Sequence, residues 1–111
     1  MDRLWDVLDK TPLRIEIASP APGTIQIALS GDLDFDTAAE LTSLPVDGYD
    51  RVDVDLSGLA FIDSSGLASL VRLQQAVAKT GAVLRVVALT PYVRSLMRMT
   101  ALDRLFGIPP A

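Results

Sequence analysis

The sequence predicts an α/β domain with a mixed four-stranded sheet packed with three to four helices. After a first hairpin, apolar segments typical of strands alternate with segments whose apolar residues have helical spacing. A strand, a helix and a further strand form a parallel pair with a right-handed crossover, whereas a hairpin adds an antiparallel pair. The 111 residues, half of them apolar, suffice to bury one core without disulfides or metals.

The first two strands are predicted at residues 13–17 and 24–29, where apolar and polar residues alternate. The Ser-Pro-Ala-Pro-Gly stretch between them is rich in turn residues, so the two strands form a hairpin. A short helix is expected from Thr37, which has the spacing of a capping box with Glu40, to about residue 44. The proline and glycine that follow end this helix.

The second half of the chain predicts two further strand and helix pairs. Alternation over residues 52–56 indicates a strand, and apolar residues at helical spacing from Gly66 to a capping Gly81 indicate a helix. The apolar run at 82–89 is typical of a strand covered on both faces. Thr90 as cap and the proline after it start a helix that reaches Met99. A further helical turn is expected around residues 102–106.

Composition argues against several functions. The chain has neither cysteine nor histidine, so it has no disulfides, no thiol nucleophile and no thiolate metal site. A net charge of -4 argues against direct binding of nucleic acid. The charged N-terminal residues rule out the apolar core of a signal peptide, and no run approaches the roughly 18 apolar residues of a membrane span. We expect a cytoplasmic protein without membrane insertion, metal or cofactor.

The first twelve residues form a separate N-terminal extension before a single domain at 13–108. The extension carries four apolar residues with amphipathic spacing, namely Leu4, Trp5, Val7 and Leu8. This spacing suits a helix that docks on the fold or on a second copy of the chain.

Two adjacent serines, Ser64 and Ser65, stand at the start of the helix predicted in the middle of the chain. A serine nucleophile needs an adjacent base, but the only lysines are Lys10 and Lys79, and the latter lies about 20 Å along the same helix. We therefore expect no enzymatic activity and no catalytic residue. Either serine can cap the helix by accepting an N–H bond. A phosphoryl group is also tolerated at a helix N-terminus, so capping does not exclude modification.

Three carboxylates, Asp32, Asp34 and Asp36, stand at alternate positions between a strand and a helix. If the second and third strands are parallel neighbours, these residues emerge at the same end of the sheet as Asp63 and Ser64. A phosphate would then add about -1.5 to -2 charge to this face. The alternative is that the three carboxylates are ordinary solvated turn and cap residues.

Other interpretations of the acidic residues fail on spacing. A calcium loop beginning at Asp32 would need glycine at its sixth position and glutamate at its twelfth, where the chain has Thr37 and Ser43. Asp53 and Asp55 alternate with apolar residues and are interpreted as strand surface, with no site implied.

Two motifs together indicate a family. LSGDLDFDTAAEL occurs at 29–41, and DVDLSGLAFIDSSGLASL begins at Asp53. The pattern G-D/E-L-D before the first helix and D-S-S-G-L before the second is specific as a pair. On these motifs, the chain strongly resembles the STAS domain of anti-sigma factor antagonists over about residues 13–108. The resemblance implies a STAS-like fold.

The resemblance also implies a role. Ser64 matches the serine that an anti-sigma factor with serine kinase activity phosphorylates, and Ser65 is the alternative acceptor. The unphosphorylated form binds this partner and releases a sigma factor, and phosphorylation switches binding off, which regulates transcription by partner switching. A phosphatase is a further expected partner, and the chain is expected to be a monomer or a weak homodimer. The partner-binding residues implied are Asp32, Asp34, Phe35, Asp36, Asp63, Ser65 and Gly66.

The same domain suits other roles. The alternatives are a stand-alone STAS accessory subunit of a lipid or anion ABC transporter, or a component of a stress-sensing assembly. In those proteins an intact Asp-Ser-Ser-Gly stretch need not accept a phosphate.

Overall fold

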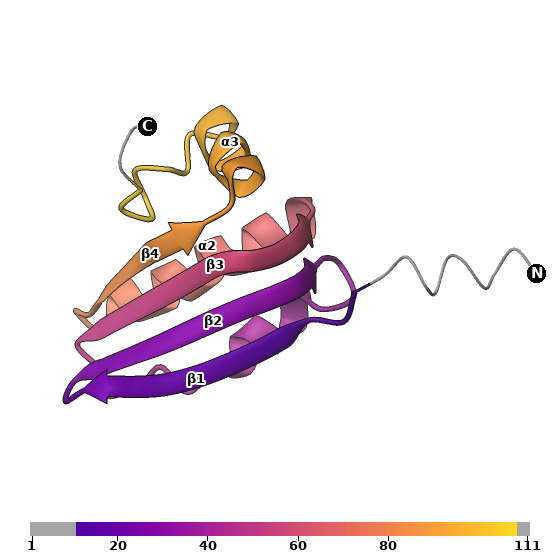
Figure 1. Cartoon of the computed structure of the whole chain (residues 1–111). Coiled ribbons are helices and arrows are strands. Elements are labelled where there is room, and N and C mark those ends of the chain that lie inside the picture. The colour runs from indigo at the N-terminus through magenta and orange to yellow at the C-terminus, as the bar shows by residue number, and fades with distance from the viewer. Residues whose placement is uncertain (1–10, 109–111) are drawn as a thin grey trace, which may run out of the picture.

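The computed structural model describes residues 11–108. The elements follow in the order β1 (Arg14–Ala21), β2 (Thr24–Leu33), η1 (Ala38–Ser43), β3 (Arg51–Ile62), α2 (Ser64–Lys79), β4 (Val83–Leu89) and α3 (Pro91–Met99). The strands form one sheet in the order β1-β2-β3-β4, in which β1 and β2 are antiparallel and the other two pairs are parallel (Figure 1). The predicted mixed sheet is confirmed.

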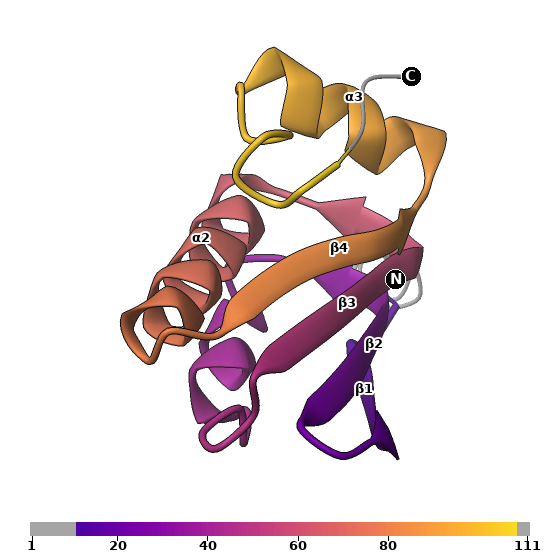
Figure 2. The same cartoon turned by 90° about the vertical axis from the view of Figure 1, so that its left-hand side faces the viewer.

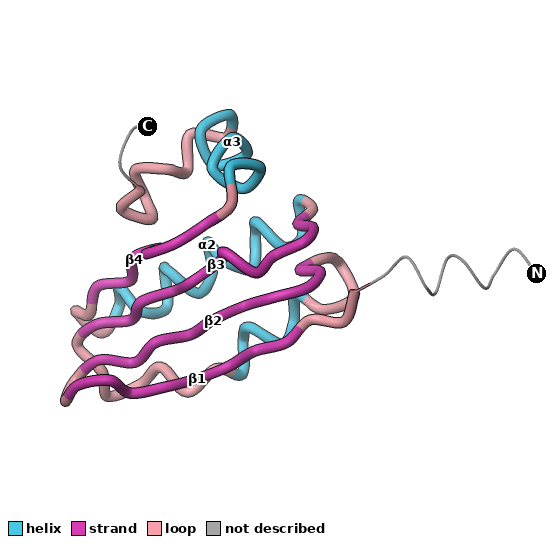
Figure 3. The backbone as a smooth tube through the Cα atoms, in the orientation of Figure 1, coloured by secondary structure: helices cyan, strands magenta, loops and turns pink. Residues whose placement is uncertain are grey.

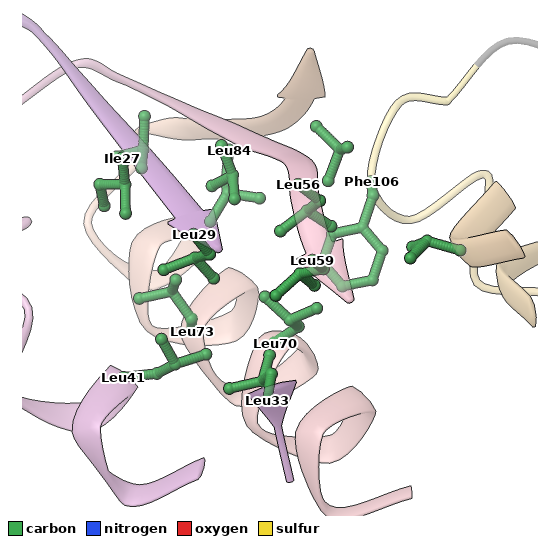
Figure 4. Packing of buried hydrophobic residues seen from close by; sticks show 14 of the residues in the cluster. Ile27, Leu29, Leu33, Leu41, Leu56, Leu59, Leu70, Leu73, Leu84 and Phe106 are labelled. Atoms are coloured by element: carbon green, nitrogen blue, oxygen red, sulfur yellow. The ribbon is translucent and has the colours of Figure 1, made fainter. Parts of the chain in front are cut away.

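Helices cover one face of this sheet. In Figure 2, α2 and η1 lie on one side of the strands, and Figure 3 shows the opposite side open toward the viewer. The buried positions of β2 and β3 alternate and point to the helices. These side chains pack against the apolar side of α2 and against the ring of Phe106 (Figure 4). The resulting core includes Ile27, Leu29, Leu56, Leu59, Leu70, Leu73 and Phe106.

β4 is covered on one face only, although the sequence predicted a strand covered on both faces. Val83 and Val87 are exposed, and Arg85 between them is exposed too, whereas the alternate residues Leu84 and Val86 are buried. The expectation that both faces of this strand are covered is therefore wrong. An apolar run indicates that at least one face of a strand is buried, but it does not show whether a helix also covers the second face.

One local prediction is wrong and a second is confirmed. Thr37 does not cap the short helix η1 with its side chain, because its hydroxyl donates to the backbone oxygen of Asp32 at 2.9 Å. The single helical turn predicted around residues 102–106 is present, because the Phe106 N–H donates to the Leu102 carbonyl at 3.3 Å, although it does not extend into a longer helix. The Phe106 carbonyl, at the end of this turn, accepts a hydrogen bond from the Val86 N–H at 2.9 Å, which fixes the segment beside β4.

Other termini agree with the sequence. Thr90 caps α3 by accepting from the Val93 N–H at 3.1 Å, and Gly81 adopts a φ of 86° after α2.

Asp53 lies on the strand surface, where its ion pair with Arg51 at 2.8 Å raises the pKa of the guanidinium. Among the helices of residues 11–108, none has the length and apolar character needed to cross a membrane. The predicted helical extension lies outside the described residues, apart from Thr11 and Pro12.

Candidate functional site

The carboxyl ends of the parallel strands bring both sequence motifs together. Leu33 at the end of β2 is the register partner of Ile62 at the end of β3, so the loop after β2 and the start of α2 lie at one edge of the sheet (Figure 1). The acidic residues of the first motif therefore lie at the same edge of the sheet as Asp63 and Ser64, as predicted. We call this region the carboxyl edge.

Asp63 connects the two motifs. One carboxylate oxygen accepts from the Gly66 N–H at 2.9 Å, which makes Asp63 the N-cap of α2. The other oxygen accepts from the Phe35 N–H at 3.1 Å. The prediction that a serine caps this helix is wrong, because the preceding carboxylate already occupies that role.

Ser64 is consequently left as an exposed first residue of α2. Within residues 11–108, no hydrogen-bond partner is found for its hydroxyl, nor for that of Ser65, which is half-buried. The Ser64 hydroxyl is the more accessible of the two predicted acceptors. It stands at the positive end of the α2 dipole, beside the first N–H groups of the helix.

Gly66 has a packing role. A β-carbon at this position would lie 2.2 Å from the Leu33 carbonyl oxygen and 2.9 Å from the Ile62 side chain. The residue is buried, and the partner contact that the resemblance implies for it stays a prediction. Its missing side chain lets α2 begin directly against the end of β2.

Asp32 is buried, with 8% of its surface exposed. Its carboxylate accepts from the Thr11 N–H at 3.1 Å, and its own N–H donates to the Thr11 carbonyl at 3.0 Å. The interpretation of Asp32 as a solvated residue is wrong, because this pair of bonds fixes the chain before β1 against β2.

Asp34 is buried as well, with 6% exposed. Its carboxylate accepts from the N–H groups of Asp36 and Thr37 at 3.0 and 3.2 Å. The Thr37 hydroxyl also accepts from the Asp34 N–H at 2.9 Å. These bonds hold the loop after β2 in one conformation. Thr37 was not predicted as a site residue, although an aspartate three positions before a threonine is a spacing typical of such local bonds.

The same loop presents an exposed aromatic ring. Phe35 is 78% exposed while its N–H is held by Asp63, and Asp36 beside it is exposed. Two further rings lie nearby, because Phe61 is 44% exposed shortly before Asp63 and Tyr92 donates to the Ile62 carbonyl at 3.3 Å. Phe61 and Tyr92 were missed by the sequence analysis, although both flank strand ends at the carboxyl edge.

The carboxyl edge can present a hydroxyl, carboxylates and apolar rings. Within the described residues, no group of three or more histidine, cysteine, aspartate or glutamate side chains could hold a metal ion. Lys79 lies at the opposite end of α2 from Ser64. These groups are of the kinds that another molecule can recognise through hydrogen bonds, charge and apolar contact.

Comparison with known structures places the fold. The structure matches an anti-sigma factor antagonist from Mycobacterium paratuberculosis with a TM-score of 0.74, 24% identity and coverage of 90% of this chain and 87% of that one. It matches the anti-sigma factor antagonist SpoIIAA with a TM-score of 0.67, 18% identity and coverage of 87% and 100%. It also matches murine Solute Carrier 26 family member A9, an anion transporter, with a TM-score of 0.75, 14% identity and coverage of 99% of this chain but 22% of the transporter.

The sequence itself matches the family described as "Mlab, STAS domain" over residues 18–108. This match includes both motifs, the four strands except for the first residues of β1, and all three helices of the described structure. The chain therefore belongs to the STAS domain family.

Proposed function

We propose that this protein is an anti-sigma factor antagonist that is switched by phosphorylation of Ser64. In this proposal the unphosphorylated form binds an anti-sigma factor that is also a serine kinase, which frees a sigma factor. The observation that carries the proposal is the accessible Ser64 hydroxyl. This hydroxyl is not used as the N-cap of α2, because the Asp63 carboxylate caps the helix. The protein acts in the cytoplasm as a binding module rather than an enzyme.

The environment of Ser64 suits a reversible phosphate. The first N–H groups of α2 and the helix dipole favour an anion at this position. The neighbouring carboxylate of Asp63 and the exposed Asp36 repel it, so the modified edge becomes strongly negative. A partner that fits a neutral hydroxyl would have to desolvate that charge.

The exposed rings supply an anchor for the partner. Phe35 is 78% exposed on a loop that hydrogen bonds hold rigid, and exposed aromatic side chains on rigid supports commonly dominate binding energy. The likeness to SpoIIAA adds support, because that antagonist has been solved in both unphosphorylated and phosphorylated forms.

A second function is favoured by one specific observation. The fold matches the domain of an anion transporter with a TM-score of 0.75, as well as it matches an antagonist at 0.74. A chain of this kind could serve as an accessory subunit of a transporter, in which the carboxyl edge would contact another subunit without any phosphorylation.

Phosphorylation in a reconstituted system distinguishes the two functions. The wild-type chain and the Ser64→Ala and Ser65→Ala variants are incubated with ATP and each anti-sigma kinase encoded by the source organism, and intact mass is measured. We expect one phosphoryl group on the wild-type chain and on Ser65→Ala, and none on Ser64→Ala. A phosphate on Ser64→Ala but not on Ser65→Ala would overturn the assignment. Failure of every kinase to bind or modify the wild-type chain would contradict the proposed function.

A further inference from the structure

The outer edge of β1 has no strand beside it in the described part of the chain. β1 pairs with β2 on its inner side and forms the lower border of the sheet in Figure 1. All residues of β1 except Ile15 are exposed. The opposite edge of the sheet differs, because the Val86 N–H of β4 donates to the Phe106 carbonyl. An exposed strand edge presents unpaired N–H and C=O groups, with which a further strand can pair.

The part of β1 that can accept another strand is short. The pairing of β1 with β2 is regular from Arg14 to Ala18, and its register shifts before Ala21. Pro20 lies in the irregular part and has no backbone N–H to donate. A pairing strand is therefore limited to about residues 13–18, which read Leu-Arg-Ile-Glu-Ile-Ala.

The side chains of this segment alternate between the two faces of the sheet. Ile15 is the register partner of the buried Leu29, so it lies on the face that the helices cover, and Ile17 shares that face. Arg14 and Glu16 consequently lie on the open face. Both are exposed, they carry opposite charges, and neither has an ion-pair partner among residues 11–108.

This alternation makes the segment complementary to itself in an antiparallel pair, where directly opposite residues lie on the same face. A two-fold axis at Ile15 places Arg14 of each chain opposite Glu16 of the other. It also places Leu13 opposite Ile17, which is 47% exposed in the single chain. An axis at Arg14 or Glu16 would instead place two like charges opposite each other, which is destabilising. An axis between two residues would bring side chains of different faces together.

We propose that β1 pairs antiparallel with β1 of a second copy of this chain, in the register centred on Ile15. The two four-stranded sheets then form one continuous sheet, with the helices of both copies on the same face. Two ion pairs between Arg14 and Glu16 flank the axis on the open face, and Leu13 packs on Ile17 on the other face. The paired segment is small, so the dimer is reversible and depends on protein concentration. This proposal does not depend on the proposed function.

Exchange of the two charges tests the proposal. Sedimentation equilibrium measures the dimer dissociation constant of the wild-type chain, of Arg14→Glu, of Glu16→Arg and of the double variant with both changes. We expect each single variant to weaken the dimer about tenfold, because both ion pairs become like-charge pairs, and the double variant to restore it. Arg98→Glu is the matched control, because it makes the same change of charge at an exposed site on α3 and should leave the dissociation constant unchanged. A wild-type chain that stays monomeric up to about 1 mM, or a double variant as weak as the single variants, would overturn the proposal.

Disulfide formation tests the register without relying on charge. The chain has no cysteine, so Ile15→Cys and Ile17→Cys each introduce one thiol. In the proposed register the two copies of position 15 have Cα atoms about 4.5–5.5 Å apart, a distance that a disulfide can bridge. The two copies of position 17 are four residues out of register, which is about 14 Å along the strand.

We expect mild oxidation to link two chains of Ile15→Cys and to leave Ile17→Cys unlinked, although Ile17 is the more exposed residue. Intact mass and gel mobility without reductant measure the linked fraction. Linkage of Ile17→Cys alone, equal linkage of both variants or linkage of neither would overturn the proposal.

Discussion

The Asp63 carboxylate bonds two segments that are far apart in the sequence. One oxygen caps α2 at Gly66, and the other holds the Phe35 N–H in the loop after β2. A single side chain thus starts the helix, positions the exposed ring and leaves the Ser64 hydroxyl accessible. Asp63 therefore contributes to the stability of the fold and also to the shape of the proposed recognition surface.

We expect Asp63→Ala to lower the free energy of unfolding by about 1–3 kcal/mol, because it removes a helix cap and leaves a second N–H unpaired. Asp63→Asn should lose less, since its amide oxygen can still accept one of the two bonds. Urea denaturation followed by circular dichroism measures both values. Equal midpoints for the alanine variant and the wild-type protein would show that the cap is unimportant.

We expect Asp32 and Asp34 to contribute to stability, in addition to any part they have in partner binding. Both carboxylates are buried and accept backbone N–H groups, so Asp32→Ala and Asp34→Ala should each cost about 1–3 kcal/mol of unfolding free energy. Glu40→Ala is the control, because Glu40 is exposed and such changes usually stay within about 0.5 kcal/mol. Thermal melts compare the melting temperatures of the three variants with that of the wild-type protein. An unchanged melting temperature for Asp32→Ala would refute the structural role of Asp32.

We expect a substitution at Phe35 to affect binding of the partner rather than stability. Its ring is largely exposed, so Phe35→Ala should leave stability within about 0.5 kcal/mol of the wild type. Loss of an anchor residue should weaken the complex with the anti-sigma kinase by about 1–2 kcal/mol or more, which is roughly tenfold. Met99→Ala is a matched control, because Met99 is 81% exposed on α3. Calorimetric titration that finds equal affinity for both variants would remove Phe35 from the interface.

At the scale of elements, the position of α2 depends on one missing side chain. Gly66→Ala would place a methyl group 2.2 Å from the Leu33 carbonyl oxygen, so the helix must move away from β2. We expect a loss of about 1–3 kcal/mol, as for other overpacked sites. Ser65→Ala also introduces alanine into this turn but meets no such contact, and it should be nearly neutral. A fully stable Gly66→Ala variant with an unchanged amide spectrum would contradict this packing.

The elements could largely be predicted from sequence periodicity, because alternation and helical spacing record which side of each segment is buried. The placement of Asp32, Asp63 and Ser64 at one edge of the sheet could be predicted from the parallel pairing of β2 and β3. The burial of Asp32 could not be predicted, since it depends on a bond to Thr11, 21 residues away. The bond between the Phe106 carbonyl and the Val86 N–H could not be predicted either, because it is a tertiary contact that local spacing does not indicate.

At the scale of the whole molecule, the proposed switch alters a surface and leaves the fold in place. The start of α2 is fixed by the Asp63 cap and by contact with the end of β2, and a helix N-terminus tolerates an added phosphate. The effect should fall on the complex, where an unpaired buried charge costs roughly 2 to 5 kcal/mol and weakens binding about 30-fold or more.

Phosphoserine introduced at position 64 during expression tests this central claim most directly. Amide spectra of the modified and unmodified chains are compared, and both are titrated with the anti-sigma kinase. We predict spectral changes confined to the first turn of α2 and the loop at 34–37, together with at least about 30-fold weaker binding. Changes that extend along β4 from Val83 to Val87, or unchanged affinity for the kinase, would contradict a switch that acts through the surface at Ser64.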